Sequence, residues 1–112
     1  MQWAARCFLL LASVDAQAVK VLDVASYDAF AAKEGTFLLK FFAPWCGHSR
    51  ALAPEYEAVA AELSGKLPVA EVDGTVNDAL ATKFDVKGYP TIFFVRDGTP
   101  FEFSGDRTSA KV

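Results

Sequence analysis

The sequence predicts an α/β sandwich in which helices cover both faces of a mixed β-sheet. Three observations indicate this fold class. Short apolar or β-branched segments alternate with segments of helical periodicity, a nearly continuous apolar run at residues 36–42 is typical of a central strand, and an Asp-Gly pair near the end predicts a hairpin. The order strand, helix, strand, helix, strand, helix, hairpin matches a layered α/β domain.

The first part of the domain is expected to hold a strand on each side of a short helix. Residues 19–22 are rich in β-branched side chains and predict the first strand. A helix follows to about Lys33, with Ser26 expected as its N-terminal cap and Gly35 ending it. Residues 36–42 then predict a central strand that is covered on both faces.

The longest helix is expected over residues 46–63, where apolar residues recur with helical spacing. Pro54 lies inside this segment and is expected to bend the helix, and Gly65 is expected to close it. Residues 67–72 predict another strand, and residues 77–84 predict a shorter helix.

The last part is predicted to be an antiparallel hairpin. Residues 91–95 combine β-branched and aromatic side chains, as strands do. Asp97 and Gly98 are a strong hairpin signal, and residues 100–103 are expected to return along an edge of the sheet. The sequence contains neither an internal repeat nor a low-complexity linker.

The segment between the central strand and the longest helix carries the predicted chemistry. A Pro-Trp turn leads to Cys46, which opens the helix. Since the positive end of a helix dipole favours a thiolate, the pKa of Cys46 is expected to fall, which makes Cys46 the candidate nucleophile. His48 can add positive charge or a hydrogen bond, and Gly47 is expected to let the chain turn tightly. The alternatives are an inert buried cysteine and a solvated helix histidine.

This segment resembles the active site of the protein disulfide isomerases, whose fold is thioredoxin-like. Their usual motif is Trp-Cys-Gly-His-Cys-Lys, which this chain follows from Trp45 to His48. Ser49 replaces the second cysteine and Arg50 replaces the lysine. The resemblance covers nearly all of the chain from about Val19 and implies a thioredoxin-like three-layer sandwich with a central mixed sheet.

The resemblance also implies that one helix is missing. Family members finish with a helix that covers one sheet face, and such a helix would only be starting at residues 109–112. We therefore expect this face to be partly exposed, or covered by something outside the sequence. A truncated chain is the alternative to a short protein.

Four further residues take roles from the resemblance. Tyr89 and Pro90 resemble the cis-proline element that faces the active-site cysteine and pairs with an extended substrate, and an ordinary trans turn is the alternative. Trp45 is expected to add an apolar surface for the substrate. Arg107 matches an arginine that tunes thiol pKa values in the family, or is simply a surface arginine.

Lys40 and Glu71 are predicted to be a charge-swapped pair. The family has a buried glutamate six residues before the nucleophile, paired with a lysine on the adjacent strand, and this chain has Lys40 and Glu71 at these positions. The swapped pair leaves neither charge alone and is expected to tune the thiol pKa. The alternative is that Lys40 extends from a strand end into solvent.

A single thiol restricts the chemistry of this site. Cys46 can attack a substrate disulfide and form a mixed disulfide, but Ser49 cannot resolve it by forming a second one. Glutathione or a substrate thiol would have to do so. The sequence therefore predicts a monothiol disulfide isomerase acting on cysteine-containing secretory proteins, and the alternative is a module that retains such clients without turnover. No cofactor is expected, and one Cys and one His are too few ligands for a closed zinc site.

Residues 1–18 predict a secretory signal peptide. Arg6 precedes a short apolar run and a small-x-small cleavage site, although a buried N-terminal helix is an alternative. Cleavage would leave residues 19–112, with Cys7 removed and Cys46 as the remaining thiol. The expected location is the lumen of the endoplasmic reticulum, or the cell exterior because no Lys-Asp-Glu-Leu-type signal ends the sequence.

Charge and hydropathy argue against nucleic-acid binding and against a membrane span. The formal net charge is -3 and the basic residues form no cluster, which argues against nucleic-acid binding. Apolar runs are too short to predict a transmembrane helix.

Overall fold

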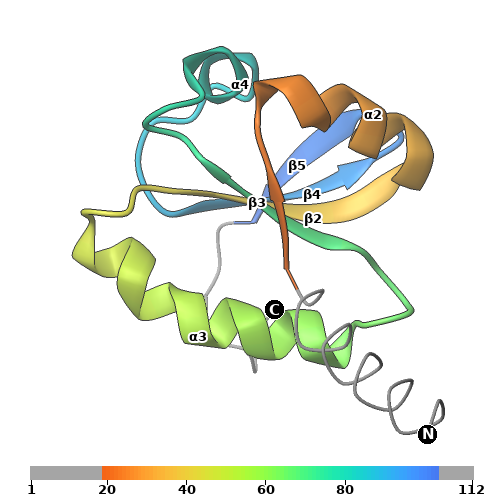
Figure 1. Cartoon of the computed structure of the whole chain (residues 1–112), viewed down its shortest axis with the longest axis horizontal. Helices are drawn as coiled ribbons and strands as arrows, with labels where there is room; N and C mark the ends of the chain where they lie inside the picture. The colour runs from red at the N-terminus through yellow and green to blue at the C-terminus, as the bar shows by residue number, and fades with distance from the viewer. Residues whose placement is uncertain (1–18, 104–112) are drawn as a thin grey trace, which may run out of the picture.

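A five-stranded mixed sheet forms the middle layer of the computed structural model, which describes residues 19–103 (Figure 1). The strand order is β1-β3-β2-β4-β5. β1, β3 and β2 are parallel, whereas β4 is antiparallel to β2 and β5 is antiparallel to β4. This arrangement confirms the predicted α/β class and the central place of the apolar run. The strands are β1 (Lys20–Leu22), β2 (Thr36–Phe42), β3 (Val69–Asp73), β4 (Thr91–Arg96) and β5 (Thr99–Phe103).

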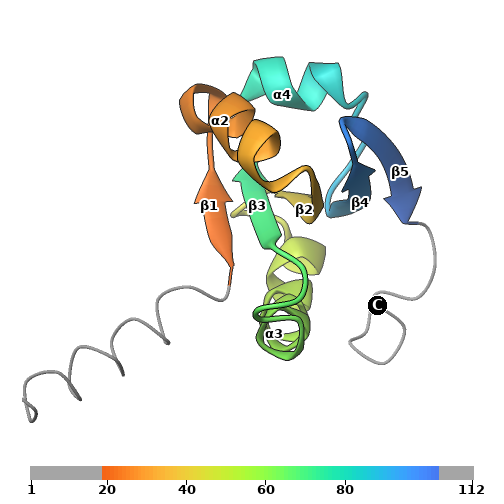
Figure 2. The same ribbon diagram turned by 90° about the vertical axis from the view of Figure 1, so that its right-hand side faces the viewer.

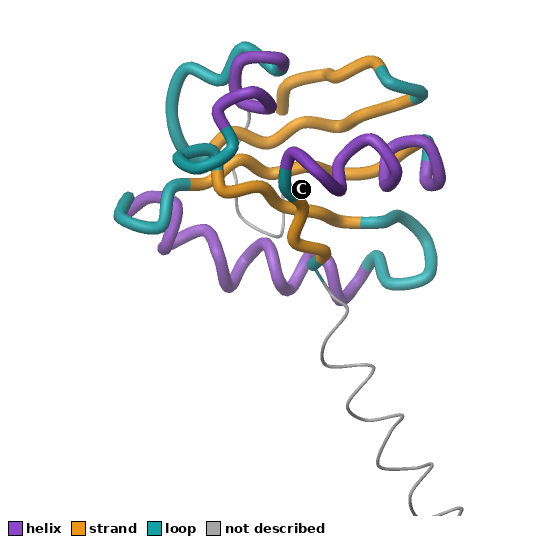
Figure 3. The backbone as a smooth tube through the Cα atoms, turned by 45° about the horizontal axis from the view of Figure 1, so that its top comes forward, coloured by secondary structure: helices purple, strands orange, loops and turns teal. Residues whose placement is uncertain are grey.

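The helices form the two outer layers. α2 (Val24–Glu34) and α4 (Asp78–Lys83) cover one face of the sheet, and α3 (Gly47–Glu62) crosses the other face, as the tube view in Figure 3 also shows. Pro54 is accommodated inside α3. In the described part of the chain, no helix is long and apolar enough to cross a membrane.

The cap of α2 differs from the prediction. Asp23, not Ser26, is the N-cap, and its carboxylate accepts a hydrogen bond of 2.8 Å from the backbone N–H of Ser26. The Ser26 hydroxyl accepts one of 3.0 Å from the backbone N–H of Asp23, which completes a capping box. The Ser26 N–H lowers the pKa of Asp23. At the other end Gly35 has φ 75°, a left-handed conformation that favours glycine, so the predicted helix end is confirmed.

Each face of the sheet has its own core. Against α2 and α4 lies a cluster rich in aromatic rings, and against α3 lies a mainly aliphatic one. Alternation along β2 divides its side chains between the two. Phe37, Leu39 and Phe41 join the aromatic cluster, while Leu38 joins the aliphatic one.

The β4–β5 hairpin turns as the sequence predicts. Asp97 and Gly98 have φ values of 50° and 85°, as in a type I′ turn, and Arg96 pairs with Thr99. α3 lies below β2 and β3 rather than below this hairpin (Figure 2). Phe101 on β5 is accordingly 54% exposed. The predictions for residues 1–18, for Arg107 and for residues 109–112 lie outside the described residues.

Candidate functional site

Cys46 lies where the central strand passes into α3. β2 ends at Phe42, and a turn follows in which the Cys46 N–H donates to the Ala43 carbonyl at 3.0 Å. The Cys46 carbonyl then accepts from the Arg50 N–H at 3.0 Å, which makes Cys46 the N-cap of α3. Its side chain is partly buried and free of any disulfide. The predicted position of the thiol at a helix N-terminus is therefore confirmed.

The helix N-terminus lowers the pKa of Cys46. The Ser49 N–H contributes most, and the His48 N–H, the Ser49 hydroxyl and the charge of Arg50 act in the same direction, while desolvation opposes them. In the conformation described, the sulfur makes no capping hydrogen bond to the helix. Its pKa is lowered because the N–H groups and the positive charge at the start of α3 favour the thiolate.

The Ser49 side chain is buried at the start of α3, three residues after the thiol. The residue is 3% exposed, and its hydroxyl oxygen accepts a 3.2 Å hydrogen bond from the Ala43 N–H. It begins the stripe of buried residues with which α3 packs on the sheet; the others are Leu52, Tyr56, Val59 and Ala60. Ser49 thus ties the start of α3 to the end of the turn after β2.

A carbonyl from another part of the chain faces the thiol. The Tyr89–Pro90 peptide bond is cis, and the Cys46 thiol donates to the Tyr89 carbonyl across 3.8 Å. The Tyr89 ring lies against Gly74, where a Cβ atom would collide with the tyrosine hydroxyl. Glycine at position 74 therefore leaves room for the ring. The structure brings Tyr89 and Pro90 to Cys46, as the sequence predicts.

The other residues of the motif surround the thiol at the surface. The Trp45 side chain is 69% exposed, the His48 side chain is exposed, and Arg50 donates to the Pro44 carbonyl at 3.4 Å. The structure shows no conformational requirement for glycine at position 47. Gly47 has no left-handed backbone conformation, and a Cβ atom there would meet nothing within 4 Å.

Lys40 and Glu71 form a salt bridge inside the molecule. They are register neighbours on β2 and β3, and their N–O distance is 3.2 Å. The Lys40 side chain is 3% exposed, and its ammonium group lies 4.5 Å from the centre of the Tyr56 ring. The predicted pairing is confirmed, and the alternative of a solvated lysine is wrong. Neither residue is among the groups that shift the pKa of Cys46, so their effect on the thiol stays a prediction.

Asn77 is a structural residue that the sequence analysis missed. Its side chain accepts from the Val24 N–H at 3.0 Å and donates to the Asp73 carbonyl at 2.9 Å, and the residue is 8% exposed. It therefore joins the start of α2 to the end of β3, near Gly74 and the Tyr89 ring. In the sequence, an asparagine before a helix signals only a local cap, which Asn77 does not make.

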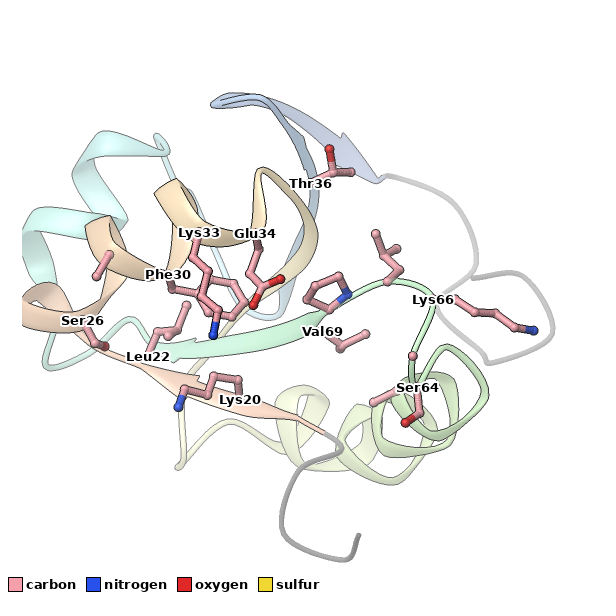
Figure 4. Close-up of a pocket in the computed structure, with 15 residues that line it drawn as sticks. Lys20, Leu22, Ser26, Phe30, Lys33, Glu34, Thr36, Ser64, Lys66 and Val69 are labelled. Carbon is pink, nitrogen blue, oxygen red and sulfur yellow. The ribbon is translucent and has the colours of Figure 1, made fainter. Parts of the chain in front are cut away.

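A hollow of about 1020 Å³ lies at the other end of the fold (Figure 4). Its walls come from β1, α2, the end of α3 and the loop that leads to β3. The predicted site residues do not line this hollow, which is separated from Cys46 by the length of α3. Among residues 19–103, no group of three or more His, Cys, Asp and Glu side chains is arranged to hold a metal ion.

Comparison with known proteins agrees with this fold. The profile of the thioredoxin family matches residues 18–112. Protein disulfide-isomerase A4 of Bos taurus is 45% identical over 97 residues, which are 84% of this chain and 15% of that protein. The probable protein disulfide-isomerase A4 of Caenorhabditis elegans is 43% identical over 97 residues, again 15% of its length and 86% of this chain.

A solved structure resembles the fold closely. The first thioredoxin domain of mouse protein disulfide-isomerase A4 superposes with a TM-score of 0.78 at 44% identity, covering 83% of this chain and 69% of that one. The chain thus corresponds to one domain of these relatives and spans about 15% of the curated proteins it matches.

Proposed function

Because the chain belongs to the thioredoxin family, we propose that it carries out thiol–disulfide exchange on cysteine-containing proteins, with Cys46 as its single nucleophile. The observation that carries this proposal is the thiol at the N-terminus of α3, which has a lowered pKa and faces the Tyr89 carbonyl. A thiolate is the attacking form of a cysteine, so this environment supports attack on a disulfide near neutral pH.

The proposed reaction has two exchanges and no net oxidation. In the first, the Cys46 thiolate attacks one sulfur of a client disulfide, a mixed disulfide forms, and the other client sulfur leaves as a thiolate. In the second, a thiolate of the client or of glutathione attacks the client sulfur of the mixed disulfide, and Cys46 leaves as a thiolate. When the attacking thiolate belongs to the client, a rearranged client disulfide forms, which is isomerase chemistry with one thiol. When glutathione attacks, a client–glutathione disulfide forms, and a further client thiolate must displace glutathione to complete the rearrangement.

Residues around Cys46 are proposed to hold the client chain. An extended peptide that passes beside the cis-proline segment can pair with backbone groups next to Pro90, because proline itself has no N–H to occupy them. Trp45 offers an exposed apolar surface on the other side of the thiol. His48 is proposed to stabilise the thiolate when its imidazole is charged, and Arg107 is proposed to tune the thiol pKa.

The proposed setting is the secretory pathway, most specifically the lumen of the endoplasmic reticulum. The support is the predicted signal peptide and the identity to protein disulfide-isomerases. Clients there are folding proteins that acquire disulfides.

Retention without turnover is the second candidate function, and Ser49 favours it. A dithiol enzyme escapes from a slow mixed disulfide by attack of its second cysteine, whereas this site has a serine at that position. If external thiols reach the mixed disulfide slowly, the client stays bound.

Refolding of a scrambled-disulfide substrate in glutathione buffer tests both candidates. The full chain with Cys7→Ala is compared with the same chain carrying Cys46→Ala as well, and covalent adducts are followed on non-reducing gels. Recovery of substrate activity that depends on Cys46 is expected. Stable adducts without recovery would establish retention instead. If the folded protein gave neither recovery nor adducts, both proposals would be overturned.

A further inference from the structure

We propose that the hollow at the far end of α3 binds an extended, acidic peptide segment, and so gives this domain a second protein-binding surface remote from Cys46. Binding of the segment needs neither the thiol nor the exchange reaction. The inference therefore goes beyond the proposed function, and a peptide without cysteine can test it.

The hollow lies at the end of the fold opposite the thiol. β1, β2 and β3 run parallel, and residues at their starts line the hollow, namely Lys20, Thr36 and Val69, whereas Cys46 follows the end of β2. The last turns of α2 and α3 complete its walls. With 16 residues α3 is about 24 Å long, so a ligand in the hollow and a client disulfide at Cys46 do not compete for the same space.

Apolar side chains form much of the lining. Leu22 and Val69 are buried, but Phe30 and Leu67 are each only half-buried and still present apolar surface to the hollow. The volume of about 1020 Å³ is that of a large ligand pocket and far exceeds the space that a single water or ion needs. A peptide of several residues can therefore remove apolar surface from water here, which favours its binding.

The charged side chains of the lining are mainly basic. Lys20, Lys33 and Lys66 stand against one carboxylate, that of Glu34, although the whole chain has a net charge of -3. All three lysines are exposed, and none of them forms a salt bridge with another residue in the described part of the chain. Their ammonium groups are therefore available to an acidic ligand.

Helix dipoles reduce this positive charge without cancelling it. The C-terminal ends of α2 and α3 both lie at the hollow, and each carries the equivalent of about half a negative charge. Three ammonium groups and one carboxylate give a charge of +2, so about one positive charge remains. The hollow is thus a basic site on an acidic domain, and this distribution of charge attracts acidic partners to it.

The spacing of the lysines favours a peptide over a compact anion. Figure 4 shows Lys20 and Lys33 at one end of the hollow and Lys66 at the other. They belong to β1, to α2 and to the loop after α3. A phosphate group could contact only one end, whereas an extended chain with acidic residues at both ends and apolar residues between them matches the lysines and the apolar lining together.

Occupation of the hollow is expected to favour particular clients. An extended chain needs about seven residues, at about 3.4 Å each, to span the length of α3. A client that carries an acidic and apolar segment at least this far from its reactive disulfide can contact the hollow and Cys46 together, and the first contact raises the effective concentration at the second. This consequence rests on the proposed exchange function, whereas binding of the segment does not.

Fluorescence anisotropy with a labelled peptide, Glu-Glu-Leu-Val-Leu-Glu-Glu, tests the inference with the full chain in reducing buffer. Saturable binding is expected. The double variant Lys20→Glu with Lys33→Glu should weaken it about tenfold, because each change replaces an attraction by a repulsion. Lys83→Glu with Lys87→Glu is the matched control, since it alters the net charge equally at exposed lysines outside the hollow, and its effect should be less than about twofold.

Altered ligands separate the two parts of the site. Gln-Gln-Leu-Val-Leu-Gln-Gln removes the charges and Glu-Glu-Ser-Ser-Ser-Glu-Glu removes the apolar centre, and each is expected to bind at least about fivefold more weakly. Inorganic phosphate should displace the peptide no better than chloride at equal ionic strength. Equal binding of the serine peptide, or selective displacement by phosphate, would indicate a simple anion site and overturn the inference.

Backbone amide NMR shifts of the parent protein locate the peptide, and they keep the test valid if a lysine variant does not fold. Shifts are expected at Lys33, Gly65 and Leu67, which line the hollow, and not at Cys46. Absence of saturable binding, shifts confined to another surface, or equal losses in the two double variants would overturn the inference. No readout here uses thiol exchange, so such results would leave the proposed function standing, and a failure of Cys46-dependent refolding would leave the peptide site standing.

Discussion

At the scale of single residues, the pKa of Cys46 depends on the backbone N–H groups that begin α3. The first N–H groups of a helix have no partner within the helix, and in α3 those of Ser49 and His48 lower the pKa of Cys46 by favouring its thiolate. Arg50 adds its charge from the next turn, and its guanidinium is itself held by the Pro44 carbonyl. The largest contribution to the lowered pKa of Cys46 therefore comes from a backbone N–H group at the start of α3.

The lowered pKa of Cys46 predicts a pH-dependent contribution to stability. Because the pKa is lower in the folded than in the unfolded chain, the contribution is fully present above the usual thiol pKa and is lost as pH falls through the lowered value. Relative to Cys46→Ala, the parent protein should gain thermal stability as pH rises across this window. Melting temperatures in reducing buffer over a pH series check this, and a constant difference between the two proteins would contradict it.

Part of the site could be predicted from the sequence alone. A cysteine that opens a helix after a buried strand is enough to predict an acidic thiol. The hydrogen bond from Ala43 to Ser49 could not be predicted, because it depends on the exact path of the turn. Gly47 shows what a motif leaves open, since the backbone there follows an ordinary helical start that does not require glycine.

At the scale of elements, local patterns predict where strands and helices lie better than they predict how elements are joined. The hairpin turn follows directly from Asp97 and Gly98. The bridge that Asn77 makes to Val24 spans 53 positions in the sequence, and no local pattern contains it. The sequence predicts Ser26 as the cap of α2 instead of Asp23 because both are good caps, and the structure uses them reciprocally in a capping box.

The Lys40–Glu71 pair between β2 and β3 predicts strong coupling between these strands. Lys40→Glu would place two carboxylates side by side at a buried position and is expected to cost about 3 to 5 kcal/mol in the free energy of unfolding. The double variant Lys40→Glu with Glu71→Lys restores opposite charges and should recover most of this loss. Recovery should be incomplete, because the ammonium group no longer lies over the Tyr56 ring.

Denaturant unfolding of the single and double variants measures this coupling. Lys87 provides the matched control, since it pairs with Asp85 at 3.0 Å on the surface, with both side chains about 80% exposed. Lys87→Glu should change stability by less than about 1 kcal/mol. The prediction is contradicted if Lys40→Glu lowers the free energy of unfolding no more than Lys87→Glu does. It is also contradicted if the double variant is as unstable as Lys40→Glu alone.

At the scale of the whole molecule, the sheet is covered unevenly. Within residues 19–103, α2 and α4 cover the aromatic core, whereas α3 covers the opposite face only below β2 and β3, so no described helix covers that face below the hairpin (Figure 2). On the uncovered side, Phe94 and Phe103 are partly buried against the aliphatic core, and Phe101 alternates onto the same face between them. Aromatic side chains at an edge strand favour association between molecules.

Phe101 is therefore predicted to promote self-association of the chain. Phe101→Thr keeps a residue that suits a strand but removes the ring, and it should weaken association by about 1 to 2 kcal/mol, or about five- to thirtyfold in the dissociation constant. Glu102→Thr is the control, because Glu102 points to the opposite face of the same strand and is also exposed. Sedimentation velocity over a concentration series distinguishes the two variants. If both variants associate like the parent protein, the uncovered face is not the contact between molecules. If only Phe101→Thr weakens association, and the rate of Cys46 alkylation is unchanged, the association surface is distinct from the site of exchange.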